Sequence, residues 1–272
     1  MHAVHACSTP KGEPRLARII ALVNQKGGVG KSTTAVNLGA ALAVLGKRVL
    51  VVDADPQGNA TTGLGIEKPK LQRDVYDLLL QEAAVDDIIV PTELEGLWLL
   101  PATMNLAGAE IELVSAMSRE TRMRQAIVPV ASRYDFVFID CPPSLGLLTI
   151  NALTAADECI IPVQAEYYAL EGLSQLTSVV RRVREALNPQ LRVSGVLVTM
   201  FDGRTRLATE VLEELVKFFP EQMFKTQIPR NVRLSEAPSY GKPVILFDIK
   251  SRGAQAYLAV ARELLEPAEV RA

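Results

Sequence analysis

Several features are scarce in this sequence of 272 residues. No apolar run reaches the length of about 18 residues that suggests a membrane-spanning helix. Aromatic residues make up only 5% of the chain, and the net charge is −2 at pH 7. Because so small a charge produces no strong overall field, any contact with nucleic acid must come from a local basic patch.

Cysteine is also scarce. The three cysteines, Cys7, Cys141 and Cys159, lack the spacing of a metal site. A reducing cytoplasm suits them. Because Cys141 and Cys159 lie in or beside apolar strands, we expect them to be small buried hydrophobes without a redox role.

The ends of the chain differ from its middle. The first residues contain no apolar segment of signal-peptide length and include Pro10, Gly12 and Pro14, so we expect residues 1–17 to form a flexible tail. Apolar residues make up 49% of the chain, which excludes global disorder. No long polar linker interrupts residues 18–266, so these are predicted to form one domain, followed by a C-terminal tail at 267–272.

Short β-branched runs alternate with amphipathic stretches along this domain. The expected strands are Ile19–Val23, Arg48–Asp53, Leu97–Leu100, Phe136–Asp140, Cys159–Val163, Val193–Phe201 and Met223–Thr226. The expected helices are Ser32–Leu45, Val75–Gln81, Ala107–Ser118, Glu120–Ala131, Leu147–Ala155, Leu170–Leu187, Thr205–Phe219, Val232–Ala237 and Ala254–Leu265. Such alternation predicts the α/β class, with a single doubly wound, mostly parallel sheet and helices on both of its faces.

One glycine-rich run lies between the first expected strand and the first expected helix. It reads Lys26-Gly27-Gly28-Val29-Gly30-Lys31-Ser32-Thr33. In this context backbone N–H groups can close around a phosphate chain, and the positive end of the helix dipole points at the same anion. Lys31 can reach the outer phosphates and Ser32 can bind a magnesium ion. The run therefore predicts a phosphate-binding loop, the alternative being a glycine-rich turn that binds nothing.

The loop departs from the common pattern, because Gln25 stands where the first glycine is usual and Lys26 opens the loop. In this respect it resembles the deviant Walker A loop of the ParA/MinD ATPases, which have the P-loop NTPase fold. The resemblance implies ATP and Mg²⁺ as cofactors and places all residues from Lys26 to Thr33 at the nucleotide. It also implies that Lys26 reaches across a dimer interface to the partner's nucleotide, so that Lys26 and Lys31 both serve catalysis.

A second motif follows the expected strand Arg48–Asp53. A carboxylate at this end of a strand can hold a magnesium ion or orient water. Pro56 and Gly58 favour a defined turn and then a mobile segment. Similar segments in ParA-type ATPases form switch I, which implies that Asp55 positions the attacking water and that Asp53 supports the site or the strand end. A polar strand exit without a catalytic role is the alternative.

A third motif begins with the apolar strand Phe136–Asp140, which ends in a carboxylate about 110 residues after the phosphate loop. This is a Walker B arrangement, in which Asp140 would contact the metal through a water while Ser32 binds it directly. The sequence Asp140-Cys141-Pro142-Pro143-Ser144 is close to that of ParA proteins. Their MinD-like relatives typically have a Pro-Ala-Gly ending instead.

A fourth segment carries Pro229 and Asn231, and Asn231 is a plausible N-cap for a short helix. In ParA-type proteins the matching segment borders the adenine, which implies that Pro229 and Asn231 are nucleotide-binding. A plain connection between a strand and a helix is the alternative.

A local basic patch lies in the last quarter of the chain. Between Lys225 and Arg252 there are six basic and two acidic residues. A solvated surface is the plain explanation, and arginines on loops also suit phosphate contacts without sequence specificity. In the chromosomal ParA group, arginines in matching contexts bind DNA, which implies DNA-binding roles for Arg204 and Arg233. The cluster Arg181, Arg182 and Arg184 is expected to be a solvated helix face.

The resemblance covers residues 18–265 and identifies the chain as a chromosome- or plasmid-partitioning ATPase of the ParA/Soj type. It implies a homodimer in ATP, non-specific binding of double-stranded DNA, and a ParB-type partner that stimulates hydrolysis and release. The implied location is the cytoplasm, at the nucleoid and without membrane contact.

Three alternatives remain. A MinD-like membrane-associated positioning ATPase would carry a basic amphipathic C-terminal helix, whereas this chain ends in Glu266-Pro267-Ala268-Glu269. A metal-cluster carrier would need bridging cysteines, and Cys141 belongs to the Walker B turn. A scaffold without hydrolysis would not need Lys31 and Asp55.

Overall fold

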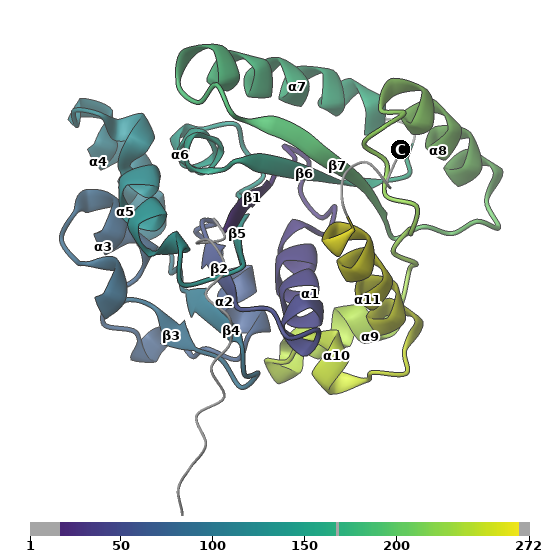
Figure 1. The fold of residues 1–272 in the computed structure, drawn as a ribbon, viewed down its shortest axis with the longest axis horizontal. Coiled ribbons are helices and arrows are strands. Elements are labelled where there is room, and N and C mark those ends of the chain that lie inside the picture. The colour runs from purple at the N-terminus through teal and green to yellow at the C-terminus, as the bar shows by residue number, and fades with distance from the viewer. Residues whose placement is uncertain (1–16, 167–168, 267–272) are drawn as a thin grey trace, which may run out of the picture.

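The structure, a computed structural model, describes residues 17–166 and 169–266. Its centre is a seven-stranded sheet with the order β3-β4-β2-β5-β1-β6-β7 (Figure 1). Neighbouring strands pair in parallel, except that β3 pairs antiparallel with β4. The strands are β1 (Arg18–Leu22), β2 (Val49–Asp53), β3 (Val90–Pro91), β4 (Leu97–Leu100), β5 (Phe136–Asp140), β6 (Glu158–Gln164) and β7 (Arg192–Thr199). The predicted mostly parallel sheet is confirmed.

Helices cover both faces of the sheet, with α1 and α11 on one side and α5, α6 and α7 on the other (Figure 1). The α-helices are α1 (Lys31–Val44), α2 (Asn59–Gly63), α3 (Val75–Leu80), α4 (Leu106–Glu112), α5 (Arg122–Ala131), α6 (Leu147–Ala155), α7 (Ala169–Ala186), α8 (Arg206–Phe218), α9 (Val232–Glu236), α10 (Val244–Phe247) and α11 (Arg252–Leu265). The 3-10 turns are η1 (Lys68–Lys70), η2 (Val85–Asp87), η3 (Leu113–Ser115), η4 (Arg119–Thr121) and η5 (Ala237–Tyr240).

Successive residues of the central strands enter two separate cores. In β1, Ala21 belongs to the core beneath α3 to α8, whereas Ile20 and Leu22 belong to the core beneath α1, α10 and α11. In β5, Val137 belongs to the first of these cores and Phe138 to the second. Side chains of a strand alternate between faces, so the near-continuous apolar runs of the sequence reflect burial on both sides. The doubly wound arrangement is thus confirmed.

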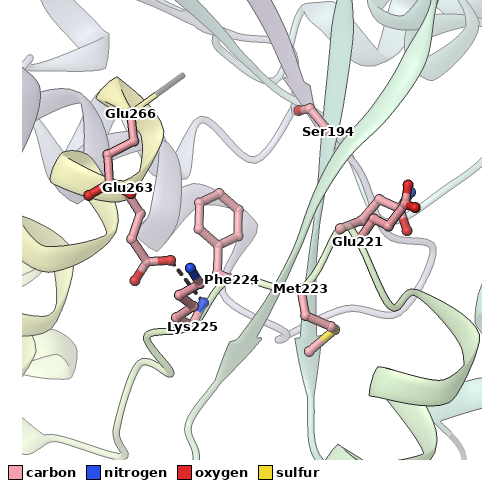
Figure 2. Close-up of a pocket in the computed structure, with 8 residues that line it drawn as sticks. Ser194, Glu221, Met223, Phe224, Lys225, Glu263 and Glu266 are labelled. Carbon is pink, nitrogen blue, oxygen red and sulfur yellow. Dashed lines mark hydrogen bonds between the residues drawn. The ribbon is translucent and has the colours of Figure 1, made fainter. Parts of the chain in front are cut away.

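The expected strand Met223–Thr226 is wrong. Only Met223 makes a bridge, to Val196 of β7. The backbone N–H group of Lys225 donates instead to the carboxylate of Glu263 in α11, at 2.8 Å (Figure 2). The backbone N–H group of Thr226 donates to the same carboxylate at 2.9 Å. A side chain of α11 therefore takes the donors that a strand ladder would have used, and the segment is fixed without strand pairing.

Other elements differ from expectation mainly in length. The expected helix Ala107–Ser118 ends as an α-helix at Glu112 and continues as the 3-10 turn η3, and the helix expected from Glu120 begins at Arg122 after η4. β3, α2 and α10 had no counterpart in the prediction, because two to five residues are too few to show a periodic pattern.

The predicted tails at 1–17 and 267–272, and with them Cys7, lie outside the described residues apart from Ala17, which is buried. Across residues 17–166 and 169–266, no helix has the length and apolar character needed to cross a membrane.

Candidate nucleotide-binding site

The glycine-rich loop joins β1 to α1 at the carboxyl edge of the sheet. Gly28 and Gly30 have φ angles of 75° and 86°, a left-handed conformation that favours glycine. Thr199, the last residue of β7, donates from Oγ1 to the backbone oxygen of Val29 at 2.8 Å. This hydrogen bond fixes the glycine-rich loop to the end of β7 at the point where the loop leads into α1.

A cavity of about 380 Å³ opens at this loop. Its lining includes the predicted residues Gly27, Gly28, Gly30, Lys31, Ser32, Thr33 and Asp55. Val29 is buried beneath the loop and Lys26 lies outside the lining. The structure thus brings together most of the residues that the first two motifs predicted.

Lys31 is the buried cation of the site. Its Nζ donates to the backbone oxygen of Lys26 at 3.2 Å. Burial lowers the pKa of Lys31, while Asp140, Cys141 and Asp55 act in the opposite direction. An anion in the cavity would favour the charged form of Lys31 further, as expected for a phosphate-binding lysine.

Asp53 and Asp55 have different surroundings. Asp53 is fully buried, and its Oδ2 accepts hydrogen bonds from the backbone N–H and the hydroxyl of Thr61 at 2.8 and 2.7 Å. Asp53 therefore links the end of β2 to Thr61 of α2, which is compatible with the expected support of the site or the strand end. Asp55 lines the cavity, and its Oδ1 accepts from the backbone N–H of Gln57 at 2.9 Å. Of the two, Asp55 is the carboxylate that a ligand can reach.

Asp140, the last residue of β5, is buried beneath the loop. Among the described residues neither carboxylate oxygen of Asp140 has a hydrogen-bond partner of normal geometry, although the Ser32 hydroxyl lies close enough to lower the pKa of Asp140. Burial, followed by the nearby Asp53 carboxylate, raises the pKa of Asp140 well above its usual range, while Ser32 and Lys31 oppose this effect. A buried carboxylate without a donor is costly unless a cation or a water completes it.

These surroundings fit a magnesium ion that is bound together with a phosphate ligand. Mg²⁺ prefers oxygen donors and commonly takes one or two protein ligands, with waters and phosphate oxygens supplying the rest. The Ser32 hydroxyl and the Asp140 carboxylate offer such donors. No group of three or more His, Cys, Asp or Glu side chains in the described part of the chain could hold a metal on its own.

A second cavity, of about 400 Å³, contains Pro229 and Asn231 in its lining. Asn231 caps α9, since its Oδ1 accepts from the backbone N–H of Arg233 at 3.0 Å. Four residues line both cavities: Gly30, Thr33, Met200 and Pro238. The two cavities therefore adjoin, and together they can hold an extended ligand with a phosphate chain at one end.

The structure places the two predicted DNA-binding arginines outside both cavities. Arg204 is 90% exposed and pairs with Asp202 at 2.6 Å. Arg233 pairs with Glu236 at 2.8 Å and Asp248 at 3.4 Å, and its guanidinium lies 5.9 Å from the ring centre of Phe247. Arg181, Arg182 and Arg184 are exposed on α7, as expected for a solvated face.

Cys141 and Cys159 are both buried. Burial raises the pKa of the Cys141 thiol well above its usual range and that of Cys159 to about 12. A thiol held in the neutral form is a poor nucleophile and metal ligand. Both cysteines are therefore small buried hydrophobes, as predicted.

Several cavity residues were not predicted from the sequence. Asn59 and Thr62 enter from α2, Met200 follows β7, and Pro238 and Lys242 come from the region around η5. For Met200 a signal existed, since it directly follows an apolar run that ends at the carboxyl edge of the sheet. The others come from short segments with no recognisable pattern.

A glycine-rich loop between a parallel strand and a helix, a buried lysine, and carboxylates at two neighbouring strand ends define a P-loop nucleotide-binding protein. Residues 17–193 match a family described as AAA domain. The chain is 61% identical over 249 residues to the sporulation initiation inhibitor protein Soj of Bacillus subtilis, covering 92% of this chain and 98% of that protein. It is 54% identical over 256 residues to the chromosome partitioning protein ParA of Myxococcus xanthus, covering 94% and 90%. The chain belongs to the ParA/Soj family of chromosome-partitioning ATPases.

Solved structures agree with this fold. A cobyrinic acid a,c-diamide synthase from Mycobacterium smegmatis with bound ADP and magnesium is 39% identical, with a TM-score of 0.81 over 92% of this chain and 94% of that one. The cell division ATPase MinD of Pyrococcus furiosus is 25% identical, with a TM-score of 0.75 over 92% and 99%.

Proposed function

We propose that this protein binds ATP with Mg²⁺ and hydrolyses the ATP to ADP and phosphate, and that this reaction drives the partitioning of DNA. The observation that carries the proposal is the group of Lys31, Asp55 and Asp140: Lys31 and Asp55 line the cavity, and the buried carboxylates of Asp140 and Asp55 both act on the Lys31 charge. The bound ADP and magnesium of the M. smegmatis relative support the choice of ligand.

Each residue of the loop has a role in this proposal. The backbone N–H groups of residues 27–33 hold the phosphates, and Lys31 neutralises the outer ones. Ser32 would hold Mg²⁺ directly and Asp140 through a water. When bound, the ion offsets the charge that develops on the transferred phosphoryl group. Asp55 orients the attacking water through Oδ2, while Gln57 fixes its other oxygen.

Lys26 acts on a second copy of the chain. It lies outside the lining of its own cavity, and its side chain is directed to Glu166 instead. In the proposed ATP-bound dimer, Lys26 of each protomer reaches the phosphates of the other, so that each site is complete only after dimerisation. The conformational state that binds DNA is then set by the nucleotide.

The ATP-bound dimer binds double-stranded DNA without sequence specificity, through Arg204 and Arg233. A ParB-type partner stimulates hydrolysis and so releases the DNA. This places the protein in the cytoplasm at the nucleoid. The relationship to Soj and ParA supports these steps, and the exposure of both arginines makes them accessible to a phosphate backbone.

The test is ATP turnover in Asp55→Ala. We expect hydrolysis to fall by roughly 100-fold or more, because a positioned acceptor for the water's proton is lost. Affinity for ATP and dimerisation in ATP should persist, since Asp55 is assigned to the water and not to the phosphates. Asp86→Ala, which removes an exposed carboxylate outside both cavities, is the control. Unchanged turnover in Asp55→Ala would contradict the assignment.

A further inference from the structure

Lys68, a residue of the 3-10 turn η1, contacts the chain directly after Asp55. Its Nζ donates to the backbone oxygen of Gln57 at 2.6 Å. Lys68 is half-buried, and in the described part of the chain it forms no ion pair. The carboxylate of the adjacent Glu67 is held by Lys70 at 2.7 Å instead. The positive charge of Lys68 is therefore directed at a peptide group.

Three hydrogen bonds fix the turn from Asp55 to Gly58. The backbone N–H of Gln57 donates to Oδ1 of Asp55 at 2.9 Å, and the backbone N–H of Gly58 donates to the backbone oxygen of Asp55 at 2.8 Å. The third is the bond from Lys68. The oxygen that Lys68 contacts and the N–H of Gly58 belong to the same peptide group. The ammonium polarises this group and so strengthens its hydrogen bond to Asp55.

Gly58 leaves the space that this contact needs. Its φ angle is 59°, in the left-handed region that favours glycine. A Cβ on Gly58 would lie 2.6 Å from Cε and 2.8 Å from Nζ of Lys68, and 2.6 Å from the backbone oxygen of Ala102. The Lys68 side chain therefore lies directly against the backbone of the turn, and a larger residue at position 58 would displace it.

We propose that Lys68 is a positioning residue for ATP hydrolysis: by holding the Gln57 carbonyl, it keeps Asp55 in the orientation that the attacking water requires. This inference rests on the proposed function, because it needs the assignment of Asp55 to that water. Lys68 lies outside the lining of both cavities, so it is not placed to contact the nucleotide. It acts on the rate of turnover and not on the affinity for ATP.

Lys68→Met tests this role, because methionine keeps an unbranched side chain against Gly58 and removes the charge and its donors. A misplacement of about 1 Å can lower a rate by roughly 100-fold, and the two remaining hydrogen bonds restrict the turn, so we expect kcat to fall by roughly tenfold. KM for ATP, the dimer in ATP and the melting temperature should match those of wild type.

Two further variants serve as comparisons. Lys70→Met is the matched control, since Lys70 lies on the same 3-10 turn and pairs with Glu67; it should hydrolyse ATP at the wild-type rate. Lys68→Arg keeps a cation with several donors and should recover part of the rate that Lys68→Met loses.

A double-mutant cycle with Asp55→Ala separates positioning from a general loss of structure. If Lys68 acts through Asp55, Lys68→Met should cause no further loss of turnover in a chain that already carries Asp55→Ala. A structural role elsewhere would lower the rate by the same factor in both backgrounds.

Two results would overturn the role of Lys68: a wild-type kcat in Lys68→Met, or equal losses in the two backgrounds. The proposed function fails in a different way. If wild-type protein does not hydrolyse ATP, or if Asp55→Ala turns over at the wild-type rate, the assignment of Asp55 is wrong and the inference about Lys68 is overturned with it.

Discussion

Nζ of Lys26 lies 2.5 Å from Oε2 of Glu166, in a contact between the glycine-rich loop and the segment that follows β6. The two side chains are 43% and 46% exposed. An ion pair with this much exposure contributes at most about 1 kcal/mol. Lys26 can therefore leave Glu166 for the phosphates of a partner protomer with little loss of stability.

Substitutions at this pair should affect dimerisation in opposite ways. Lys26→Ala should abolish the dimer in ATP and leave binding of ATP to the protomer intact, because Lys26 lies outside its own cavity. Glu166→Gln should keep the dimer and strengthen it by no more than about fivefold, since it removes a weak competitor. Sedimentation in ATP measures both. A stable dimer in Lys26→Ala would contradict the proposed interface.

Gly27→Val tests the same proposed dimer interface at the residue next to Lys26. A Cβ at Gly27 would lie 3.9 Å from the Cβ of Pro143, an ordinary contact, so the protomer should accommodate it. We expect the melting temperature to change little and some ATP binding to remain, since Gly27 itself lines the cavity. The larger side chain should block the approach of a second loop and remove the dimer seen by light scattering. Loss of folding instead would show that the loop has no room for it.

The raised pKa of Asp53 predicts that the stability of the protein depends on pH. Burial raises the pKa of Asp53 from 3.8 to about 6. Between these values the folded protein binds more protons than the unfolded chain, so the free energy of unfolding falls as the pH rises from about 4 to 6. Asp53→Asn keeps an oxygen for Thr61 and removes the ionisable group. Its stability relative to wild type should increase over this window, by up to roughly 3 kcal/mol.

Urea unfolding at several pH values checks this prediction. Removal of the Asp53 charge should also lower the pKa of Asp140, since Asp53 is a major cause of its rise. The variant should therefore show a flatter profile than wild type. Parallel profiles would mean that Asp53 is not held with a raised pKa.

Gly65 and Gly241 bring the segment after α2 into backbone contact with the segment after η5. A Cβ on Gly241 would lie 2.7 Å from Cα of Gly65. Gly46 has a similar positive φ but no neighbour within 4 Å of a Cβ, so Gly46→Ala is a matched control. We expect Gly46→Ala to cost about 1 kcal/mol and Gly241→Ala to cost about 1–3 kcal/mol more, measured by urea unfolding. Equal losses would show that the contact yields without strain.

The parts of the site that the sequence predicted share one property: they follow apolar strands directly. The loop after β1, Asp53 and Asp55 after β2, and Asp140 at the end of β5 stand where buried runs give way to polar residues. In a parallel sheet all these ends meet at one edge, so a pattern along the chain predicts proximity in space.

Other features depend on residues far apart in the sequence. Glu263 takes the backbone donors of Lys225 and Thr226 and so prevents a strand that the local residues favour. Met200 has a φ of 51° between Thr199, which is hydrogen-bonded to Val29, and Phe201, which is hydrogen-bonded to Ile228. Such long-range contacts produce no periodic pattern in the sequence. For this reason the strand at Met223–Thr226 was predicted wrongly, and the conformation of Met200 was not predicted at all.

We expect ATP to switch this protein into a state that binds DNA. Both arginines assigned to DNA are held by exposed ion pairs within the chain, which a phosphate can replace at little cost. The double substitution Arg204→Glu and Arg233→Glu should therefore lose DNA binding and keep the dimer in ATP. Arg182→Glu, on the exposed face of α7, is the matched control and should bind as wild type does.

The most direct measurement is retention of random-sequence DNA at several salt concentrations, with ATP, ADP or no nucleotide, beside sedimentation with anionic liposomes. We expect wild-type protein to bind DNA only in ATP, with an affinity that falls steeply as salt rises, and not to sediment with liposomes. If wild-type protein does not bind DNA in ATP but sediments with liposomes, the proposed ATP-dependent DNA binding is wrong and a membrane-positioning ATPase is favoured.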